Sequence, residues 1–354
     1  MPAEVFPPGE YLRDELSERG WSERDFAEIL DRPTQAVSEI LNGRKQITAH
    51  TAIALAQALG TSPDLWLNLQ TAYDLHEARS QQASPSPVSR RARLRALVPV
   101  AELRRRGWLP DTSDVGELED GVKTLLGIRE LDQTPVFAAA ARRVDAKVAF
   151  TPQQTAWLAR FRYLAATRKV AQFDAAAIET LAADIVHRIH GPEDLAKLES
   201  WLSECGIVLI TLLPLRACKL DGAAMMLEGG TAAIGLTSRG DRMDAYVFTL
   251  LHEMAHLHLG HLKDVGLRVD EDLSAGENVS RAEGDANRQA AEWILPQDAE
   301  LPLGRPRMAT VLKAADRYRI HVSFVIGRVQ RTRQDWAFLR RSIPPVRNYV
   351  RFEV

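Results

Sequence analysis

Cysteine is nearly absent from the sequence, which has only Cys205 and Cys218 among 354 residues. So few thiols argue against a disulfide framework, and a reducing cytoplasm is the expected compartment. Neither cysteine has metal-type spacing to the other, so we expect both to be core or near-core residues. No apolar run could cross a membrane, since the longest lies around residues 207–215. The start MPAEVFPPGE also lacks the basic end and apolar stretch of an export signal. The sequence therefore predicts a cytoplasmic protein with no membrane partner.

The sequence also has no large excess of positive or negative charge: its formal net charge is only -2. Charge is nevertheless unevenly distributed along the chain. Residues 1–75 carry six Lys and Arg against twelve Asp and Glu, whereas residues 79–110 carry eight arginines against one glutamate, Glu102. With 45% hydrophobic and 26% charged residues the composition is globular, and 354 residues predict two or three domains.

Turn signals and amphipathic spacing predict five helices in an N-terminal domain, residues 1–77. Ser22 with Asp25 three residues later resembles a capping box at the start of one of them. The expected helices span about 9–19, 22–30, 34–41, 48–59 and 63–74. The Ser-, Pro- and Gln-rich stretch at residues 78–91 is expected to be a linker.

Residues 92–200 are rich in Ala, Arg and Leu with helical periodicity, and we expect them to form a helical connector. The C-terminal domain, residues 201–354, begins with three predicted strands at "GIVLITLLPL", "GAAMML" and "TAAIGLT". A buried helix, a Gly/Asp-rich loop at 263–279 and a helix at about 280–294 follow. The predicted fold class is mainly α with a smaller α+β part: a five-helix bundle, a helical connector, and a C-terminal domain with a short three-stranded sheet.

The segment "FTLLHEMAHLHLGHL", residues 248–262, places ionisable groups in an otherwise buried helix. Positions i and i+4 share a helix face, so His252 and His256 can present two ring nitrogens to one ion. Glu253 lies one step round the helix, off the ion but within reach of water there, which suits a general base. Buried imidazoles and a carboxylate are costly unless paired, and a cation compensates them. The alternative is a pair of histidines that simply pack in the core.

A catalytic zinc site needs a third protein ligand. The extended spacing, with a Gly three and a His six residues after His256, is excluded because Leu259 and Leu262 occupy those positions. The next helix, "SRAEGDANRQAAEWILP", offers Glu283, Asp285 and Glu292. Asp285 and Glu292 are two turns apart and can share a side, while Glu283 points elsewhere; periodicity alone does not choose between Asp285 and Glu292.

Three other histidines, His258, His261 and His321, are expected to pack or to lie on the surface. The expected cofactor is Zn²⁺. Two imidazoles and a carboxylate would nevertheless accept other divalent ions as well.

"DAYVFTLLHEMAHLHLGH", preceded by "AAIGLTSRGDR" and followed by "GDANRQAAEWILP", resembles the ImmA/IrrE family of zinc metallopeptidases over about residues 200–350. The resemblance implies a zincin-like domain with endopeptidase activity. In that family the glutamate before Ala-[Asp/Asn] is the third zinc ligand, which implies Asp285 here, with Glu283 in reserve. The shorter Asp, and Gln289 in place of the usual phenylalanine, depart from the family pattern.

The stretch from "FPPGEYLRDELSERGW" to "DLWLNLQTAYDL" resembles the HigA-type branch of the XRE helix-turn-helix family. The resemblance implies that the third helix enters the major groove of an operator, with some side chains near base edges and others near phosphates. The first group is Thr34, Gln35, Ser38 and Glu39, and the second is Asn42, Arg44 and Lys45. It also implies a homodimer on palindromic DNA and makes a toxin a possible partner.

The acidity of residues 1–75 weakens attraction to phosphates, so DNA affinity would rest on Arg32, Arg44 and Lys45 or on the Arg-rich segment 90–106. We favour a solvated basic linker as the interpretation of that segment.

Two functions follow from these motifs. In the first, a DNA-binding regulator is fused to a zinc endopeptidase that cleaves a helix-turn-helix repressor, in trans or in itself, with the substrate paired along the strand at 231–237. In the second, the chain is an antitoxin-like DNA-binding regulator, and the metallopeptidase-like domain senses a signal or grips a partner with little or no proteolysis.

Overall fold

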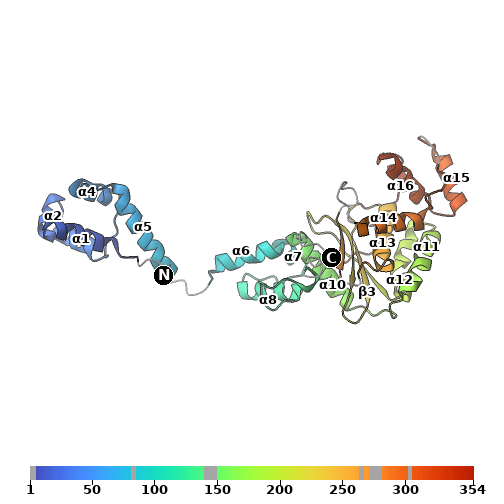
Figure 1. Ribbon diagram of the computed structural model, residues 1–354, viewed down its shortest axis with the longest axis horizontal. Helices are drawn as coiled ribbons and strands as arrows, with labels where there is room; N and C mark the ends of the chain where they lie inside the picture. The colour runs from blue at the N-terminus through green and yellow to red at the C-terminus, as the bar shows by residue number, and fades with distance from the viewer. Residues whose placement is uncertain (1–4, 81–84, 139–149, 263–266, 272–280, 302–304) are drawn as a thin grey trace. The chain divides into compact units, whose positions relative to one another are not determined.

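The computed structural model describes the chain except for residues 1–4, 81–84, 139–149, 263–266, 272–280 and 302–304 (Figure 1). Contacts between residues divide it into two compact units, 1–89 and 90–354. The segment expected as a linker, 78–91, is partly helical, because α5 (Pro63–Ser80) ends inside it and α6 (Pro87–Leu97) begins inside it. Mainly helical structure with a small sheet confirms the predicted fold class.

The first unit contains the five predicted helices. Ser22 starts the second of them through a reciprocal cap, in which Asp25 N donates to Ser22 Oγ at 3.2 Å and Ser22 N donates to Asp25 Oδ2 at 2.9 Å. Gly20 and Gly60, with φ of +68° and +72°, end the first and fourth helices in the left-handed conformation that glycine adopts at little cost. These helices are α1 (Pro8–Arg19), α2 (Glu23–Ile29), α3 (Thr34–Leu41), α4 (Ala49–Leu59) and α5.

The second unit is built on a four-stranded sheet with strand order β1-β3-β2-β4. β1 (Ile207–Thr211), β2 (Leu220–Met226) and β3 (Ala232–Leu236) are the three predicted strands, and β4 (Leu267–Glu271) lies in the segment expected as a loop. β3 pairs in parallel with β1 and antiparallel with β2, which in turn pairs antiparallel with β4.

A central β3 rules out the expected pairing of a substrate along residues 231–237. Both sides of β3 already form ladder hydrogen bonds with β1 and β2, so no incoming chain can add there. In the part of the chain that the structure describes, the end strand on the β2 side is β4.

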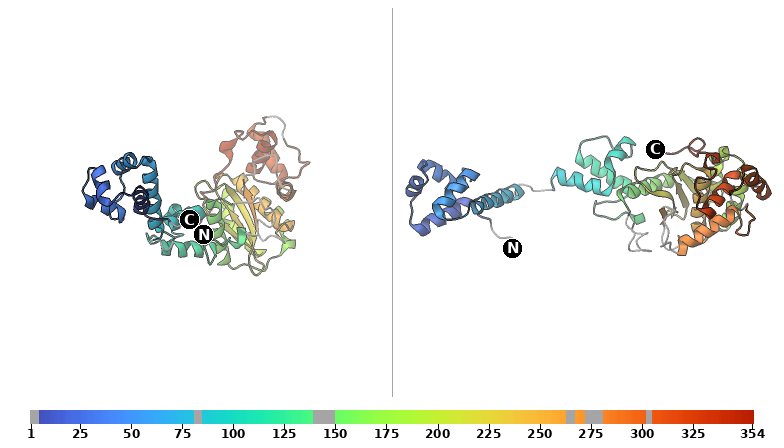
Figure 2. Two further views of the ribbon diagram at one scale, coloured as in Figure 1. Left: turned by 60° about the vertical axis from the view of Figure 1, so that its left-hand side comes forward. Right: turned by 90° about the horizontal axis from the view of Figure 1, so that it is seen from above.

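Helices cover both faces of the sheet (Figures 1 and 2). On one face, Ile207, Leu209 and Ile234 join a core with α11, α12 and α13. On the other, Val208 and Ile210 join a core with α8 and α10. This alternation along β1 is that of a strand buried on both sides. The helices of this unit are α6, α7 (Val100–Arg105), α8 (Val115–Leu126), α10 (Pro152–Ala166), α11 (Ile178–Arg188), α12 (Leu198–Glu204), α13 (Met243–His258), α14 (Arg281–Ile294), α15 (Met308–Tyr318) and α16 (Val322–Arg333), with the 3₁₀-helices η1 (Ala175–Ala177), η2 (Pro192–Lys197) and η3 (Arg340–Ser342).

Residues 92–200 are therefore not a connector separate from the domain at 201–354. Trp157 and Phe161 of α10 are fully buried, and a Cβ added at Gly235 of β3 would lie 2.9 Å from both rings. So close an approach makes α10 part of the same folded unit as the sheet.

Both cysteines are free, Cys218 in the core and Cys205 half-buried. Burial raises the pKa of the Cys218 thiol to about 11, which leaves it unreactive near neutral pH. None of the helices in the described part of the chain combines the length and apolar character that spanning a bilayer requires.

Candidate metal centre and nucleic-acid interface

The helix α13 places His252, Glu253 and His256 in the interior of the second unit. Its apolar residues pack against the sheet on one side and against neighbouring helices on others, so nearly every position from Tyr246 to Leu257 is buried. His252 and Glu253 are 0% exposed, and His256 is 1% exposed. The sequence-based expectation of ionisable groups inside an apolar helix is thus met in three dimensions.

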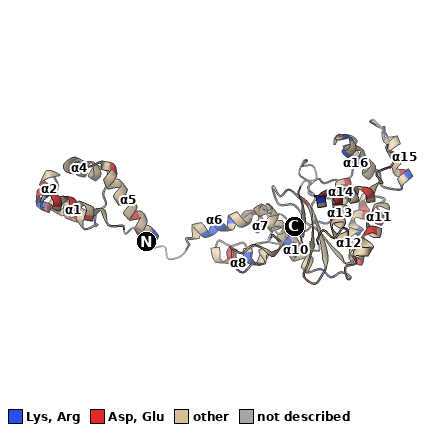
Figure 3. Cartoon of the chain, viewed as in Figure 1, with Lys and Arg blue, Asp and Glu red and all other residues tan. Residues whose placement is uncertain are grey.

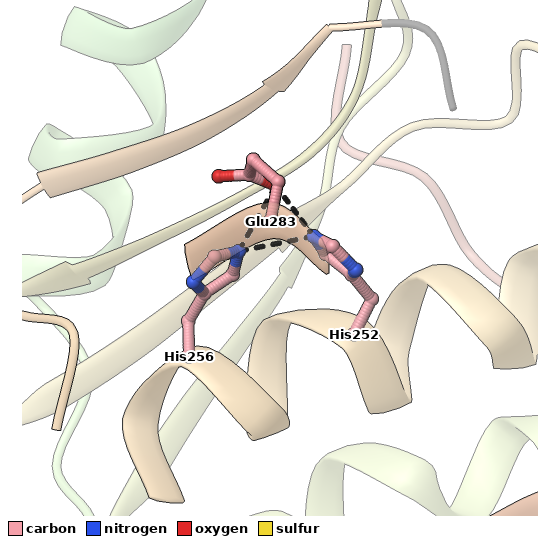
Figure 4. A group of neighbouring side chains, drawn as sticks. All are labelled: His252, His256 and Glu283. Carbon is pink, nitrogen blue, oxygen red and sulfur yellow. Dashed lines mark hydrogen bonds and ion pairs between the residues drawn. The ribbon is translucent and has the colours of Figure 1, made fainter. Parts of the chain in front are cut away.

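Glu283 from the first turn of α14 converges on the two histidines (Figure 4). The Nε2 atoms of His252 and His256 lie 3.0 Å apart, and Glu283 Oε2 lies 3.1 Å and 3.3 Å from them. Burial alone would raise the pKa of Glu283, but hydrogen bonds and charge from both imidazoles outweigh it and hold that pKa well below its usual range. The carboxylate is therefore ionised at neutral pH and faces two nitrogen donors.

This donor set fits a tetrahedral divalent ion such as zinc. Bonds of about 2.0–2.2 Å to N and O ligands separate neighbouring ligand atoms by roughly 3.3–3.5 Å in a tetrahedron, close to the distances between the three atoms here. Two imidazoles and one carboxylate are also a ligand combination that catalytic zinc sites use. Among the described residues, His252, His256 and Glu283 form the group that could hold a metal ion.

Asp285, the expected third ligand, does not join the cluster. Its carboxylate instead forms ion pairs with Arg288 and, at 3.9 Å, with Arg281 on the outer side of α14. Glu292 also faces away, since its Oε2 accepts a hydrogen bond from Gln297 N at 3.0 Å. The physical reason is the direction of α14: its first turn lies over α13, so Glu283 points inward and Asp285, two residues later, points outward.

Glu253 lies beside the cluster and against the sheet. A Cβ built on Gly222 of β2 would come within 2.7 Å of Glu253 Oε1 and of the Thr249 methyl carbon. The absent side chain at Gly222 is therefore what lets α13 hold the Glu253 carboxylate at this depth.

His261 has a role that the sequence did not indicate. Its Nδ1 lies 3.0 Å from Nδ1 of His256, on the side of that ring opposite to Glu283. A partner on the second ring nitrogen fixes the tautomer and orientation of a ligating histidine. A His five residues after the second motif histidine was the only sequence signal for it.

The other two histidines pack, as expected. His258 makes an edge contact with Trp293, with ring centroids 5.7 Å apart. His321 caps α16 by accepting a hydrogen bond from Ser323 N at 3.2 Å, and burial lowers its pKa.

In the first unit, α2 and α3 are joined by a tight turn in which Asp31 has φ +49°. Val37, Ile40 and Leu41 bury one side of α3 against the other helices. The opposite side is solvent-facing: Thr34, Gln35 and Asn42 are exposed, while Ser38 and Glu39 are half-buried.

The polar side of α3 is internally hydrogen-bonded. Gln35 Nε2 donates to Glu39 Oε1 at 3.1 Å, and Asn42 Nδ2 donates to the Ser38 carbonyl at 2.8 Å. Arg44 and Lys45 are exposed just beyond α3, and their backbone N–H groups donate to the Glu39 carbonyl. All seven residues expected at a DNA interface thus lie on or directly after one helix.

Figure 3 shows Lys and Arg gathered along α6. Part of the charge of the Arg-rich segment is neutralised by carboxylates of the second unit. Arg90 pairs with Glu119 at 2.6 Å, Arg106 pairs with Glu102 at 2.9 Å, and Arg104 pairs with Asp111. The first of these pairs joins α6 to α8. The expected interpretation of residues 90–106 as a solvated basic linker is therefore wrong, because several of these arginines form ion pairs within the second unit.

The fold and the exposed side of α3 define a helix-turn-helix domain, and comparison with known proteins agrees. The helix-turn-helix family is matched by residues 11–66. The chain is 38% identical over 71 residues to the HTH-type transcriptional regulator YddM of Escherichia coli, covering 20% of this chain and 76% of that regulator. It is 40% identical over 74 residues to antitoxin HigA-1 of Vibrio cholerae, covering 21% of this chain and 70% of the antitoxin.

A solved structure of antitoxin HigA with the higBA promoter, from Pseudomonas aeruginosa, is 32% identical and aligns with 24% of this chain and 98% of that one, with a TM-score of 0.22. The chain belongs to the helix-turn-helix family of transcriptional regulators, and HigA-type antitoxins are among its relatives.

Proposed function

We propose that this chain is a DNA-binding transcriptional regulator whose second unit is a zinc-dependent endopeptidase. The observation that carries the enzymatic part is the convergence of His252 Nε2, His256 Nε2 and Glu283 Oε2 within 3.3 Å of one another. A fourth ionisable group, Glu253, is fully buried next to them on the same helix. Structural packing alone gives no reason to bury this many ionisable groups together.

His252, His256 and Glu283 would hold the ion, and Glu253 would act as the general base and then the general acid. A zinc ion bound there supplies a Lewis acid that polarises a peptide carbonyl and makes water more acidic. Glu253 accepts the proton of the attacking water and delivers it to the amine that leaves when the peptide bond breaks. His261 holds the His256 ring in the orientation that binding requires.

The proposed substrate is a protein, and the resemblance to the ImmA/IrrE family favours a helix-turn-helix repressor, in trans or in this chain itself. An extended substrate segment cannot pair with β3, so we propose that it adds to β4, the end strand beyond β2. The test is incubation of the full-length protein with zinc and with each repressor encoded near its gene. Mass spectrometry then identifies any new termini.

Gly222→Ala is expected to lower the rate of cleavage about 100-fold without loss of bound zinc. The added methyl group meets Glu253 Oε1 and Thr249 at 2.7 Å, so the general base must move, and a displacement of about 1 Å can cost 10²-fold. The measurement is kcat together with metal content.

Gly235→Ala is the matched control. Its methyl group presses on Trp157 and Phe161 at 2.9 Å from the opposite face of the sheet. Both variants are overpacked and should lose about 1–3 kcal/mol of stability. An equal loss of kcat in the folded fraction of both would show that Gly222 does not act through Glu253.

For the first unit, we propose that α3 enters the major groove of an operator. Gln35, Ser38 and Glu39 would face base edges, and Arg44 and Lys45 would face phosphates. Membership of the helix-turn-helix family and the solvent-facing side of α3 support this. A partner toxin and a homodimer on palindromic DNA remain part of the proposal through the HigA likeness.

Replacing both Arg44 and Lys45 by Ala is expected to reduce the slope of log K against log salt by about two, because each phosphate contact contributes about one. The probe is the promoter fragment upstream of the gene, titrated by gel shift at several salt concentrations. Arg79→Ala removes an exposed charge at the end of α5 and serves as the control. If Arg79→Ala changes the slope as much per charge as the double variant, the assigned phosphate contacts are wrong.

A further inference from the structure

A cavity of about 680 Å³ lies between the first half of α13, the last turn of α14, α16 and the loop at residues 237–242 that follows β3. Its volume falls in the range of about 300–1,000 Å³ that is typical of ligand pockets. None of the three cluster residues lines it. We call it the α13–α16 pocket.

The α13–α16 pocket and the metal cluster are both formed by α13 and α14, at different positions along these helices. Thr249 lines the pocket, and Glu253 follows four residues later on the same face of α13, about 6 Å further along the axis. Both side chains face Gly222. On α14, Glu283 is in the first turn, and the pocket-lining Ala291 and Ile294 are in the last turns. The pocket-lining Thr249 is therefore one helical turn from the candidate general base.

The walls of the pocket are largely aromatic and apolar. Phe248, Ile294 and Phe324 line it, and Trp336 adds an indole ring that is 53% exposed. The Arg331 guanidinium stacks over the Phe248 ring at 4.4 Å from its centroid. Binding in the pocket would bury part of this exposed tryptophan and the apolar side chains that line the pocket with it.

The charges in the pocket favour an anionic occupant. Four arginines line it against three aspartates, and each aspartate already accepts donors from the protein. Asp221 pairs with Arg239 at 2.8 Å, and Asp244 pairs with Arg242 at 2.6 Å. The third, Asp241, accepts the backbone N–H groups of residues 346 and 347, each at 2.9 Å.

Among the arginines of the pocket, Arg328 has the guanidinium that is available to bind a ligand. It lines the pocket from α16 and is half-buried, and within the described ranges no carboxylate or hydrogen-bond acceptor contacts its guanidinium. A partly desolvated guanidinium is a strong site for a carboxylate, which it can bind through two parallel hydrogen bonds.

We propose that the α13–α16 pocket is a substrate subsite for an acidic peptide segment in which a bulky apolar residue adjoins Asp or Glu. The apolar side chain lies against Phe248 and Trp336, and the neighbouring carboxylate pairs with Arg328. This inference rests on the proposed peptidase function. It also fits the proposed substrate class, because the helix-turn-helix domain of this chain carries twelve acidic residues against six basic ones in residues 1–75.

The test measures binding without cleavage, on the full-length Glu253→Gln protein. The probes are two fluorescein-labelled peptides, GSGFEGSG and GSGFQGSG, followed by fluorescence anisotropy at low salt. A carboxylate paired with Arg328 should make the Glu peptide bind about 10- to 100-fold more tightly than the Gln peptide. Arg328→Met should abolish that preference, whereas Arg333→Met, an exposed arginine at the end of α16 outside the pocket, should retain it.

Equal affinity for the two peptides, no binding of either at millimolar concentration, or a preference that survives Arg328→Met would each overturn the proposal. A failure of the proposed peptidase function can be distinguished from a failure of the proposed subsite. If the Glu peptide is preferred through Arg328 but the wild-type protein with zinc cleaves no protein or peptide, the subsite stands as a binding site and the peptidase function is rejected.

Discussion

Glu253→Gln is expected to reduce peptide-bond cleavage about 10²- to 10⁴-fold, the usual contribution of a positioned general base. The amide has nearly the same shape as the carboxylate, so packing against Gly222 and Thr249 is retained. What is lost is the ability to accept a proton. Because Glu253 is not among the three residues that converge to hold a metal, zinc content should remain at the wild-type level.

Cleavage rate and metal content must be measured on the same preparations, since only their combination isolates the proton-transfer role. Glu204→Gln, an exposed glutamate on α12, is the matched control and should behave as wild type. Cleavage that persists in Glu253→Gln would remove the proposed chemistry. An antitoxin-like regulator with a sensing or partner-binding second unit would then be the better account.

Glu283→Gln is expected to weaken zinc binding strongly, whereas Asp285→Asn, only two residues away, is expected to leave it unchanged. Glu283 Oε2 lies 3.1 Å and 3.3 Å from the histidine nitrogens, whereas Asp285 pairs with Arg288 on the outer side of α14. Loss of a direct ligand should weaken binding by more than about 100-fold, because even supporting residues around metal ligands cost 10–100-fold. Asp285→Asn removes a surface ion pair and should leave affinity unchanged.

Competition with a chromogenic chelator measures both affinities, and His252→Ala provides the reference for a site that has lost a ligand. If Asp285→Asn weakens zinc binding as much as His252→Ala while Glu283→Gln does not, the family pattern gave the correct ligand and the observed geometry is not that of the zinc-bound protein.

The sequence predicted the parts of this protein that local chemistry determines. The helices of the first unit follow from caps and turns such as Ser22–Asp25 and Gly20, and the pairing of His252 with His256 follows from helical spacing alone. The choice of Glu283 over Asp285 depends on how α14 crosses α13. Periodicity within α14 does not contain that direction, and the family pattern pointed to Asp285, two residues away from the side chain that converges on the histidines.

The missed strand has a similar explanation. Residues 267–271 alternate apolar and polar side chains for too few positions to stand out in a Gly- and Asp-rich stretch. They are a strand because β2 offers an edge with which they pair. His261 is another case, since only the fold brings its ring to His256.

Residue 201 is not a safe place to divide this protein for expression. Gly222 and Gly235 lie on paired strands and admit α13 and α10 to opposite faces of one sheet, so the sheet under the helix that carries the histidines is itself covered by α10 on its other face. A fragment lacking α10 would leave Val208, Ile210 and Met225 uncovered in water and would be prone to aggregate. The smallest fragment of the second unit worth producing therefore begins near residue 90.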